Sequence, residues 1–130
     1  MKKTIGIFLI LFFIITSGIN ADDSADRLSG DMPTGDEEVS FVELGSVKCI
    51  PCKQMQPVMD AIEKDYAGKV KIVFHDVWQP EGRPYAEHYG IRLIPTQVFL
   101  NKDGDEIFRH EGFFPKEEIE KVLSDAGVTK

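Results

Sequence analysis

Hydrophobic and polar positions divide the chain into three stretches of different character. An almost unbroken apolar run covers residues 5–15, and a polar, mostly acidic stretch follows over residues 22–38. From Val39 onward, short apolar runs alternate with segments in which apolar residues recur every three or four positions. Such runs are typical of strands, and such recurrence is typical of amphipathic helices. The pattern predicts one folded domain over residues 39–130, preceded by two segments outside it.

Within this domain the pattern predicts alternating strands and helices. Strands are expected at residues 39–44, 70–77, 96–100 and 106–109, and helices after residue 49, at residues 84–89 and after Pro115. A strong turn at residues 101–104 joins the last two strands into a hairpin. A strand–helix–strand start followed by a hairpin predicts an α/β fold, with a central mixed sheet and helices on both faces.

The first 21 residues have the composition of a secretory signal peptide. A basic start precedes the apolar run, and small residues lead to an expected cleavage after Ala21, with cleavage after Gly18 as an alternative. An uncleaved anchor through residues 5–19 stays open. We therefore expect an exported protein in the periplasm or another extracytoplasmic compartment, where disulfides persist. Residues 22–38 contain too few large apolar groups to form a core, so a flexible lead-in is expected.

Charge and cysteine content narrow the function. Lys and Arg number 15 against 22 Asp and Glu, giving a net charge of −7. This balance excludes a typical nucleic-acid binder, which needs a basic face for phosphates. Two cysteines cannot form a disulfide-dense framework. At 130 residues the chain accommodates one domain, and nothing in it indicates an oligomer, so a monomer is expected.

The two cysteines form a CxxC motif, Cys49-Ile50-Pro51-Cys52, at a predicted strand-to-helix junction. The unpaired N–H groups and the dipole of a helix N-terminus stabilise a thiolate, which is the nucleophile in disulfide exchange. Pro51 suits a first helical turn. We expect Cys49 to attack a disulfide and Cys52, one turn further on, to resolve the product. The flanking Lys48 and Lys53 add positive potential.

The motif has three other interpretations. A zinc site would need a second pair of ligands, but there is no second CxxC, and the three histidines are scattered, so no metal is expected. A purely structural bridge would close a loop too short to stabilise the fold much. A redox-inert domain that binds extended peptides stays open.

Several separated motifs between Phe41 and Leu123 resemble the thioredoxin family. They are Cys49-Ile50-Pro51-Cys52-Lys53, Pro57 in the following helix, Tyr89-Gly90-Ile91-Arg92-Leu93-Ile94-Pro95-Thr96, the Asp103-Gly104 turn and Gly112. The resemblance implies a sheet flanked by helices, thiol–disulfide exchange on protein substrates, and no cofactor besides the cysteine pair. The chain before Val39 is short and polar, so the fold is expected to be trimmed at its N-terminus.

The resemblance also implies roles for residues outside the motif. In the family, the proline that corresponds to Pro95 is cis and lies against the CxxC. Ile94, Pro95 and Thr96 are therefore expected to bind an extended substrate. Glu43 stands where thioredoxins carry a buried acid, and a buried carboxyl can accept the proton of Cys52. An exposed glutamate at the strand end is the alternative.

This sequence departs from the family pattern at two places near the motif. Lys48 occupies the position of the usual tryptophan before the first cysteine, and the loop at residues 78–84, which begins with Trp78, is longer. The role of this loop stays open. We expect an extracytoplasmic protein-disulfide reductase, recharged by a membrane electron-donor protein. The alternatives are the peptide-binding module named above and an oxidant or isomerase.

Overall fold

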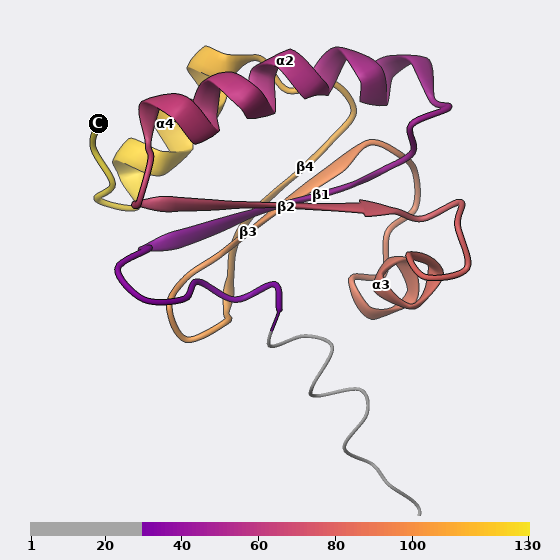
Figure 1. Cartoon of the computed structure of the whole chain (residues 1–130), viewed down its shortest axis with the longest axis horizontal. Coiled ribbons are helices and arrows are strands. Elements are labelled where there is room, and N and C mark those ends of the chain that lie inside the picture. Colours follow the sequence, from indigo (N-terminus) through magenta and orange to yellow (C-terminus); the bar gives the residue numbers. More distant parts are fainter. Residues whose placement is uncertain (1–29) are drawn as a thin grey trace, which may run out of the picture.

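The computed structural model describes residues 30–130, which form a four-stranded sheet in the order β2-β1-β3-β4 (Figure 1). The strands are β1 (Val39–Gly45), β2 (Val70–Asp76), β3 (Thr96–Leu100) and β4 (Glu106–Glu111). β1 pairs in parallel with β2 and antiparallel with β3, and β4 pairs antiparallel with β3. The sheet is therefore mixed, as the sequence predicts.

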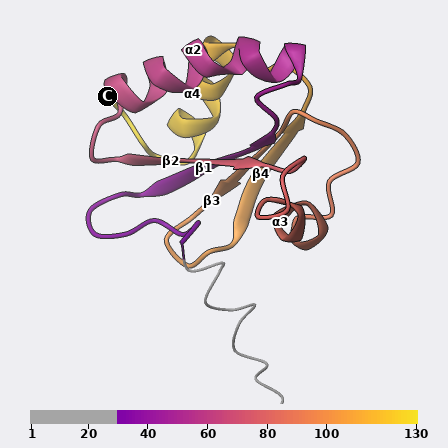
Figure 2. The same cartoon turned by 45° about the vertical axis from the view of Figure 1, so that its right-hand side comes forward.

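Within residues 30–130, three helices cover the sheet: α2 (Ile50–Asp65), α3 (Arg83–His88) and α4 (Lys116–Asp125). α2 and α4 lie on one face and α3 lies on the other (Figures 1 and 2). The element order and the α/β sandwich match the predicted fold class, so that prediction is confirmed. The boundaries differ slightly: β4 continues past Arg109 to Glu111, and α3 begins one residue earlier than expected.

Alternation along β1 divides the core between the two faces. Phe41 packs with residues of α2 and α4 in one buried cluster, whereas Val42 and Leu44 pack with residues near α3 in the other. The rings of Phe41 and Phe99 are stacked, with centroids 4.9 Å apart. Because successive strand side chains point to opposite faces, Glu43 shares the α2 face with Phe41. The strand therefore directs a carboxyl group into an apolar layer.

The adjacent Phe113 and Phe114 lie in different surroundings. Phe114 is buried and Phe113 is 44% exposed. Phe114 contributes to the cluster between the sheet and α4, and its ring stacks on those of Phe108 and His110. One aromatic side chain thus anchors the segment before α4, while its neighbour faces solvent.

The predicted signal peptide and the first part of the predicted lead-in, residues 1–29, lie outside the described residues. The remainder of the lead-in contacts the domain through Asp31, which is 2% exposed. Its carboxylate accepts a hydrogen bond from the Tyr89 hydroxyl at 2.7 Å and pairs with His75 Nε2 at 2.8 Å. Burial and this bond to Asp31 raise the pKa of Tyr89. Within residues 30–130, each helix is too short or too polar to cross a membrane.

Candidate active site

The CxxC motif lies at the N-terminus of α2, directly after β1. Cys49 is the N-cap residue, with extended backbone, and its sulfur accepts a hydrogen bond from the Cys52 N–H at 3.3 Å. The preceding loop turns at Ser46, whose carbonyl accepts from the Cys49 N–H at 3.1 Å and whose Oγ accepts from the Lys48 N–H at 3.2 Å. The chain therefore places the first sulfur over the amide groups that open the helix.

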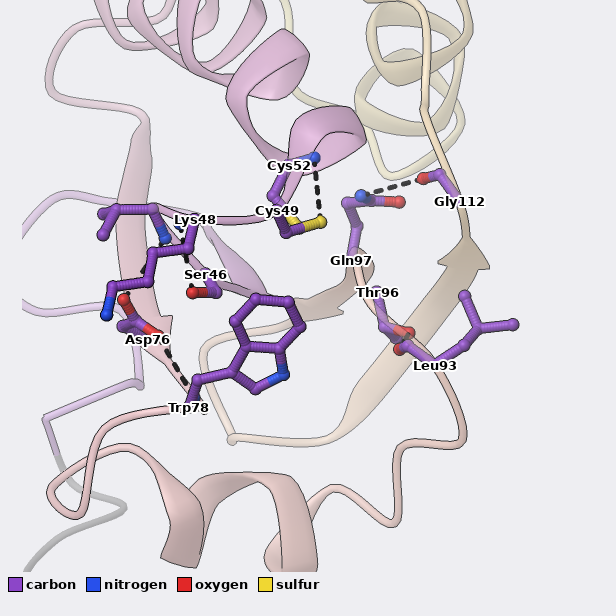
Figure 3. Close-up of a disulfide and its surroundings, with 11 residues drawn as sticks. Ser46, Lys48, Cys49, Cys52, Asp76, Trp78, Leu93, Thr96, Gln97 and Gly112 are labelled. Atoms are coloured by element: carbon purple, nitrogen blue, oxygen red, sulfur yellow. Dashed lines mark hydrogen bonds between the residues drawn. A yellow bond between two sulfur atoms is a disulfide. The ribbon is translucent and has the colours of Figure 1, made fainter.

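Cys49 and Cys52 are joined by a disulfide, with their Cα atoms 5.2 Å apart (Figure 3). Cys49 is 7% exposed and Cys52 is 5% exposed. The two residues between the cysteines are exposed by contrast: Ile50 is 74% exposed, and Pro51 is exposed as well. A reacting partner must therefore approach the pair across the surface around it rather than enter a cavity.

Lys48 and Lys53 flank the pair and are both exposed. Their ammonium groups add positive charge on either side of the motif, in the sense that favours a thiolate. Pro51 lies in the first turn of α2, where its missing N–H costs no helical hydrogen bond.

Glu43 is completely buried, with 0% exposure. A side-chain carbon built on Gly45 would lie 3.3 Å from the Cys52 sulfur and 3.5 Å from Glu43 Oε1. The carboxyl group and the sulfur therefore border the same small space over Gly45. The alternative of an exposed glutamate at the strand end is wrong. The reason is the alternation of β1, which turns Glu43 under α2.

Burial raises the pKa of Glu43 from its ordinary value of 4.5 to about 8, because the ionised form loses its hydration. Gln97, which faces Glu43 in the register of β1 and β3, opposes this and lowers the pKa. The Gln97 amide nevertheless donates its N–H to the Gly112 carbonyl at 3.1 Å, and both carboxyl oxygens of Glu43 stay without a hydrogen-bond partner. A carboxyl group with this pKa is mostly protonated at pH 7.

The Ile94–Pro95 segment reaches the same end of the sheet. Leu44 pairs with Thr96, so the start of β3 lies beside the end of β1 from which the CxxC loop leaves. The Ile94–Pro95 peptide bond is cis, as the resemblance implies. The Thr96 hydroxyl donates to the Leu93 carbonyl at 2.7 Å, and the Pro95 carbonyl accepts from the Gly112 N–H at 2.8 Å. These bonds hold both ends of the segment.

Motif reasoning did not identify two residues at this site. The sequence predicts Gln97 only as part of a strand, and its position opposite Glu43 follows from the register of β1 and β3. Gly45 carries one signal in the sequence, since it is a residue without a side chain between Glu43 and the CxxC.

The three histidines lie in separate surroundings. His75 contacts Asp31 and stacks on Tyr85, His88 lies edge-on to Tyr89, and His110 stacks on Phe114. Within residues 30–130, no three side chains of the metal-binding types come together in a group that could hold a metal ion.

Comparisons with known proteins agree with this geometry. A family model described as a thioredoxin-like domain matches residues 33–127. The chain is 34% identical over 88 residues to thioredoxin of Bacillus subtilis, covering 68% of this chain and 82% of the relative. It is 36% identical over 85 residues to thioredoxin of Staphylococcus aureus, covering 65% and 79%. It is also 34% identical over 96 residues to chloroplastic thioredoxin M4 of Arabidopsis thaliana, covering 74% of this chain but only 45% of that relative.

Solved structures show the same fold. A thioredoxin from Nicotiana alata superposes with a TM-score of 0.64 at 24% identity, covering 82% of this chain and 86% of that one. A thioredoxin variant from Halobacterium salinarum gives 0.63 at 20% identity, covering 73% and 79%. Since the family model, the sequence relatives and the disulfide-bonded CxxC agree, this chain is a thiol–disulfide oxidoreductase that belongs to the thioredoxin family.

Proposed function

We propose that the chain is an extracytoplasmic protein-disulfide reductase, which reduces or repairs disulfides in exported proteins. The observation that carries the proposal is the Cys49–Cys52 pair over the N-terminus of α2, with a buried carboxyl group across Gly45 from the second sulfur. Membership of the thioredoxin family supports protein disulfides as the general substrate class.

In the proposed reaction the reduced pair attacks a substrate disulfide. The Cys49 thiolate forms a bond to one substrate sulfur, the substrate S–S bond breaks, and the other substrate sulfur leaves as a thiolate. The helix N-terminus favours this role for Cys49, because the Cys49 sulfur is the one that caps the helix. Ile94, Pro95 and Thr96, beside the end of β1, are proposed to hold the substrate chain.

Cys52 then resolves the mixed disulfide. Its thiol gives a proton to the Glu43 carboxylate, and its sulfur bonds to the Cys49 sulfur. The second substrate thiolate is released, so the substrate gains two electrons and the pair becomes the disulfide seen in the structure. When a donor dithiol reduces the pair, the steps reverse. Protonated Glu43, whose pKa is about 8, then returns the proton to Cys52.

The spacer supports a reductase rather than an oxidant. Ile50 and Pro51 provide no histidine that would over-stabilise the Cys49 thiolate, and a less stabilised thiolate makes the dithiol form more reducing. Outside the cytoplasm the reducing equivalents are proposed to come from a membrane electron-donor protein carrying a dithiol of its own. The protein is proposed to act as a monomer, without a metal or nucleic-acid partner.

A redox titration against defined glutathione or dithiothreitol ratios tests the reaction. We expect a reversible two-electron transition near the thioredoxin value of about −270 mV. A transition near about −120 mV would indicate an oxidant, as in the strongly oxidising members of the family. A pair locked in one state would contradict catalysis and favour the peptide-binding alternative.

The compartment needs a separate test. The basic start, apolar run and small residues before Ala21 support export. Fractionation of the source cells, followed by N-terminal sequencing, should recover the protein outside the cytoplasm. Its first residue should be Asp22 if the signal is removed after Ala21, Ile19 if it is removed after Gly18, or Met1 if residues 5–19 stay as an anchor. A protein found only in the cytoplasm would contradict the proposed compartment.

A further inference from the structure

Trp78 belongs to the loop after β2 and is 52% exposed. Its backbone N–H donates to Asp76 Oδ1 at 3.1 Å, and the other oxygen of the same carboxylate accepts from the Val47 N–H at 3.2 Å. One side chain thereby ties the loop that carries Trp78 to the loop that carries the CxxC (Figure 3). Asp76 therefore holds the backbone of Trp78 next to the loop that leads to Cys49.

The rest of this loop is folded tightly. The Val77 N–H donates to the Gly45 carbonyl at 2.9 Å, and Val77 itself is buried. Further along, the Gln79 N–H donates to the Asp76 carbonyl at 3.0 Å. A side chain at Gly82 would collide with the Asp76 carbonyl oxygen, so the loop closes on itself at a residue that must be small. Trp78 is therefore presented on an ordered turn.

The exposed surface beside Cys49 carries large apolar side chains as well as the two flanking lysines. Val47 and Ile50, which precede and follow the cysteine, are 58% and 74% exposed. In Figure 3 the indole of Trp78 extends from its loop toward the disulfide, with Lys48 on one side of it and Thr96 on the other. Large exposed apolar side chains that gather at a reactive centre are typical of recognition surfaces.

We propose that Trp78 is a specificity-determining residue that contacts the polypeptide next to the substrate disulfide and favours apolar side chains there. The inference rests on the proposed function, because a protein substrate that Cys49 attacks must lie across this surface. A substrate sulfur must come into line with the nearly buried Cys49 sulfur, so the residues beside the substrate cysteine are pressed against the surrounding surface. A rigid indole offers a large contact area at small entropic cost.

Asp76 is the positioning residue of this arrangement. Its carboxylate does not reach the substrate in the proposal, and it acts by holding the Val47 and Trp78 N–H groups. Its loss should let the Trp78 loop move relative to the CxxC. Trp78 is the single tryptophan of the sequence, so its fluorescence reports this motion without a contribution from other tryptophans.

The test compares two short cyclic peptides, each closed by one disulfide, with leucines beside the cysteines in one and glycines in the other. The measured quantity is the ratio of kcat/KM for the leucine peptide to kcat/KM for the glycine peptide. We expect Trp78→Ala to lower this ratio about tenfold and Trp78→Phe to restore most of it. Ile107→Ala, which truncates an exposed apolar side chain on the distant edge strand β4, should leave the ratio unchanged. Asp76→Ala should lower the ratio and also speed the depolarisation of Trp78 emission.

A second readout follows Trp78 directly. In the Cys52→Ser variant, the mixed disulfide with each peptide accumulates, and the leucine peptide should shift Trp78 emission to shorter wavelength more than the glycine peptide does. If the wild-type chain reduces both peptides but Trp78→Ala leaves the ratio unchanged and emission does not respond, this inference is overturned while the proposed function stands. If the wild-type chain reduces neither peptide, the proposed function itself fails.

Discussion

The carboxyl group of Glu43 and the sulfur of Cys52 border one small space, and this space stays open only because residue 45 has no side chain. The two groups come from different elements, since Glu43 lies in the middle of β1 and Cys52 in the first turn of α2. Because the carboxyl group and the sulfur lie next to each other, the fold of β1 and α2 places a proton acceptor beside the resolving cysteine. The first three predictions below test this link.

Replacing Glu43 by Gln should change the pH dependence of stability. Because the pKa of Glu43 is raised from 4.5 to about 8, the unfolded chain is ionised there between these pH values while the folded chain holds its proton. The free energy of unfolding of the wild type therefore falls as pH rises from 4.5 to 8, and does not fall further above pH 8 through this group. Glu43→Gln should be more stable by roughly 2–5 kcal/mol at pH 8, with the difference shrinking toward pH 4.5.

Urea unfolding of the two oxidised proteins at pH 5 and pH 8 measures this difference. The control is the same substitution at an exposed carboxyl group. Glu117→Gln is suitable, because Glu117 is exposed in the first turn of α4. A Glu43→Gln difference that is the same at both pH values would show that the carboxyl group titrates normally.

The same variant should slow the resolving step. Without a carboxylate, the Cys52 thiol has no buried group to receive its proton, so release of the mixed disulfide should slow about 10²-fold. Single-turnover experiments with a fluorescent disulfide peptide separate the initial attack from the release. In the wild type the release rate should rise toward pH 8 as Glu43 ionises, and this dependence should vanish in Glu43→Gln. An unchanged pH profile would remove Glu43 from the mechanism.

Gly45→Ala should interfere with the same step by a different route. The added methyl group would lie 3.3 Å from the Cys52 sulfur and 3.5 Å from Glu43 Oε1, filling the space between them. We expect slower resolution, on the order of tenfold, with a smaller effect on the initial attack by Cys49. Stopped-flow measurement of both phases checks this, and a loss confined to the attack phase would contradict it.

Asp31→Ala should destabilise the domain although Asp31 lies outside the sheet. The substitution leaves the Tyr89 hydroxyl and His75 Nε2 without their partner in a buried place. The expected loss in free energy of unfolding is about 1–3 kcal/mol. Asp36→Ala, at an exposed position of the same segment, is the matched control and should change stability little. Equal unfolding midpoints for wild type and Asp31→Ala would mean that this contact contributes nothing.

Local patterns in the sequence predict most of the fold. The short apolar run at residues 39–44 predicts a strand, and the apolar stripe after Cys52 predicts α2, because both signals depend on neighbouring residues. The CxxC and the Ile94-Pro95-Thr96 motif are local as well. The sequence therefore predicts both motifs without their relative position, and the structure places both at one end of the sheet.

Contacts between distant segments could not be predicted in this way. Asp31 meets Tyr89 across 58 positions and His75 across 44, and its own surroundings in the sequence are those of a solvated acidic segment. Gln97 faces Glu43 only because β1 and β3 pair in one particular register. The Asp76 carboxylate accepts hydrogen bonds from the backbone N–H groups of Val47 and Trp78, and no periodicity encodes this link.

The central claim is that Cys49 and Cys52 exchange disulfides with a protein substrate. Reduction of insulin disulfides by the full chain, with dithiothreitol as donor and precipitation of the insulin B chain as readout, tests it most directly. The account predicts catalysed turnover by the wild type and a rate for Cys49→Ser no higher than that of dithiothreitol alone. Equal rates for the wild type and Cys49→Ser would contradict it.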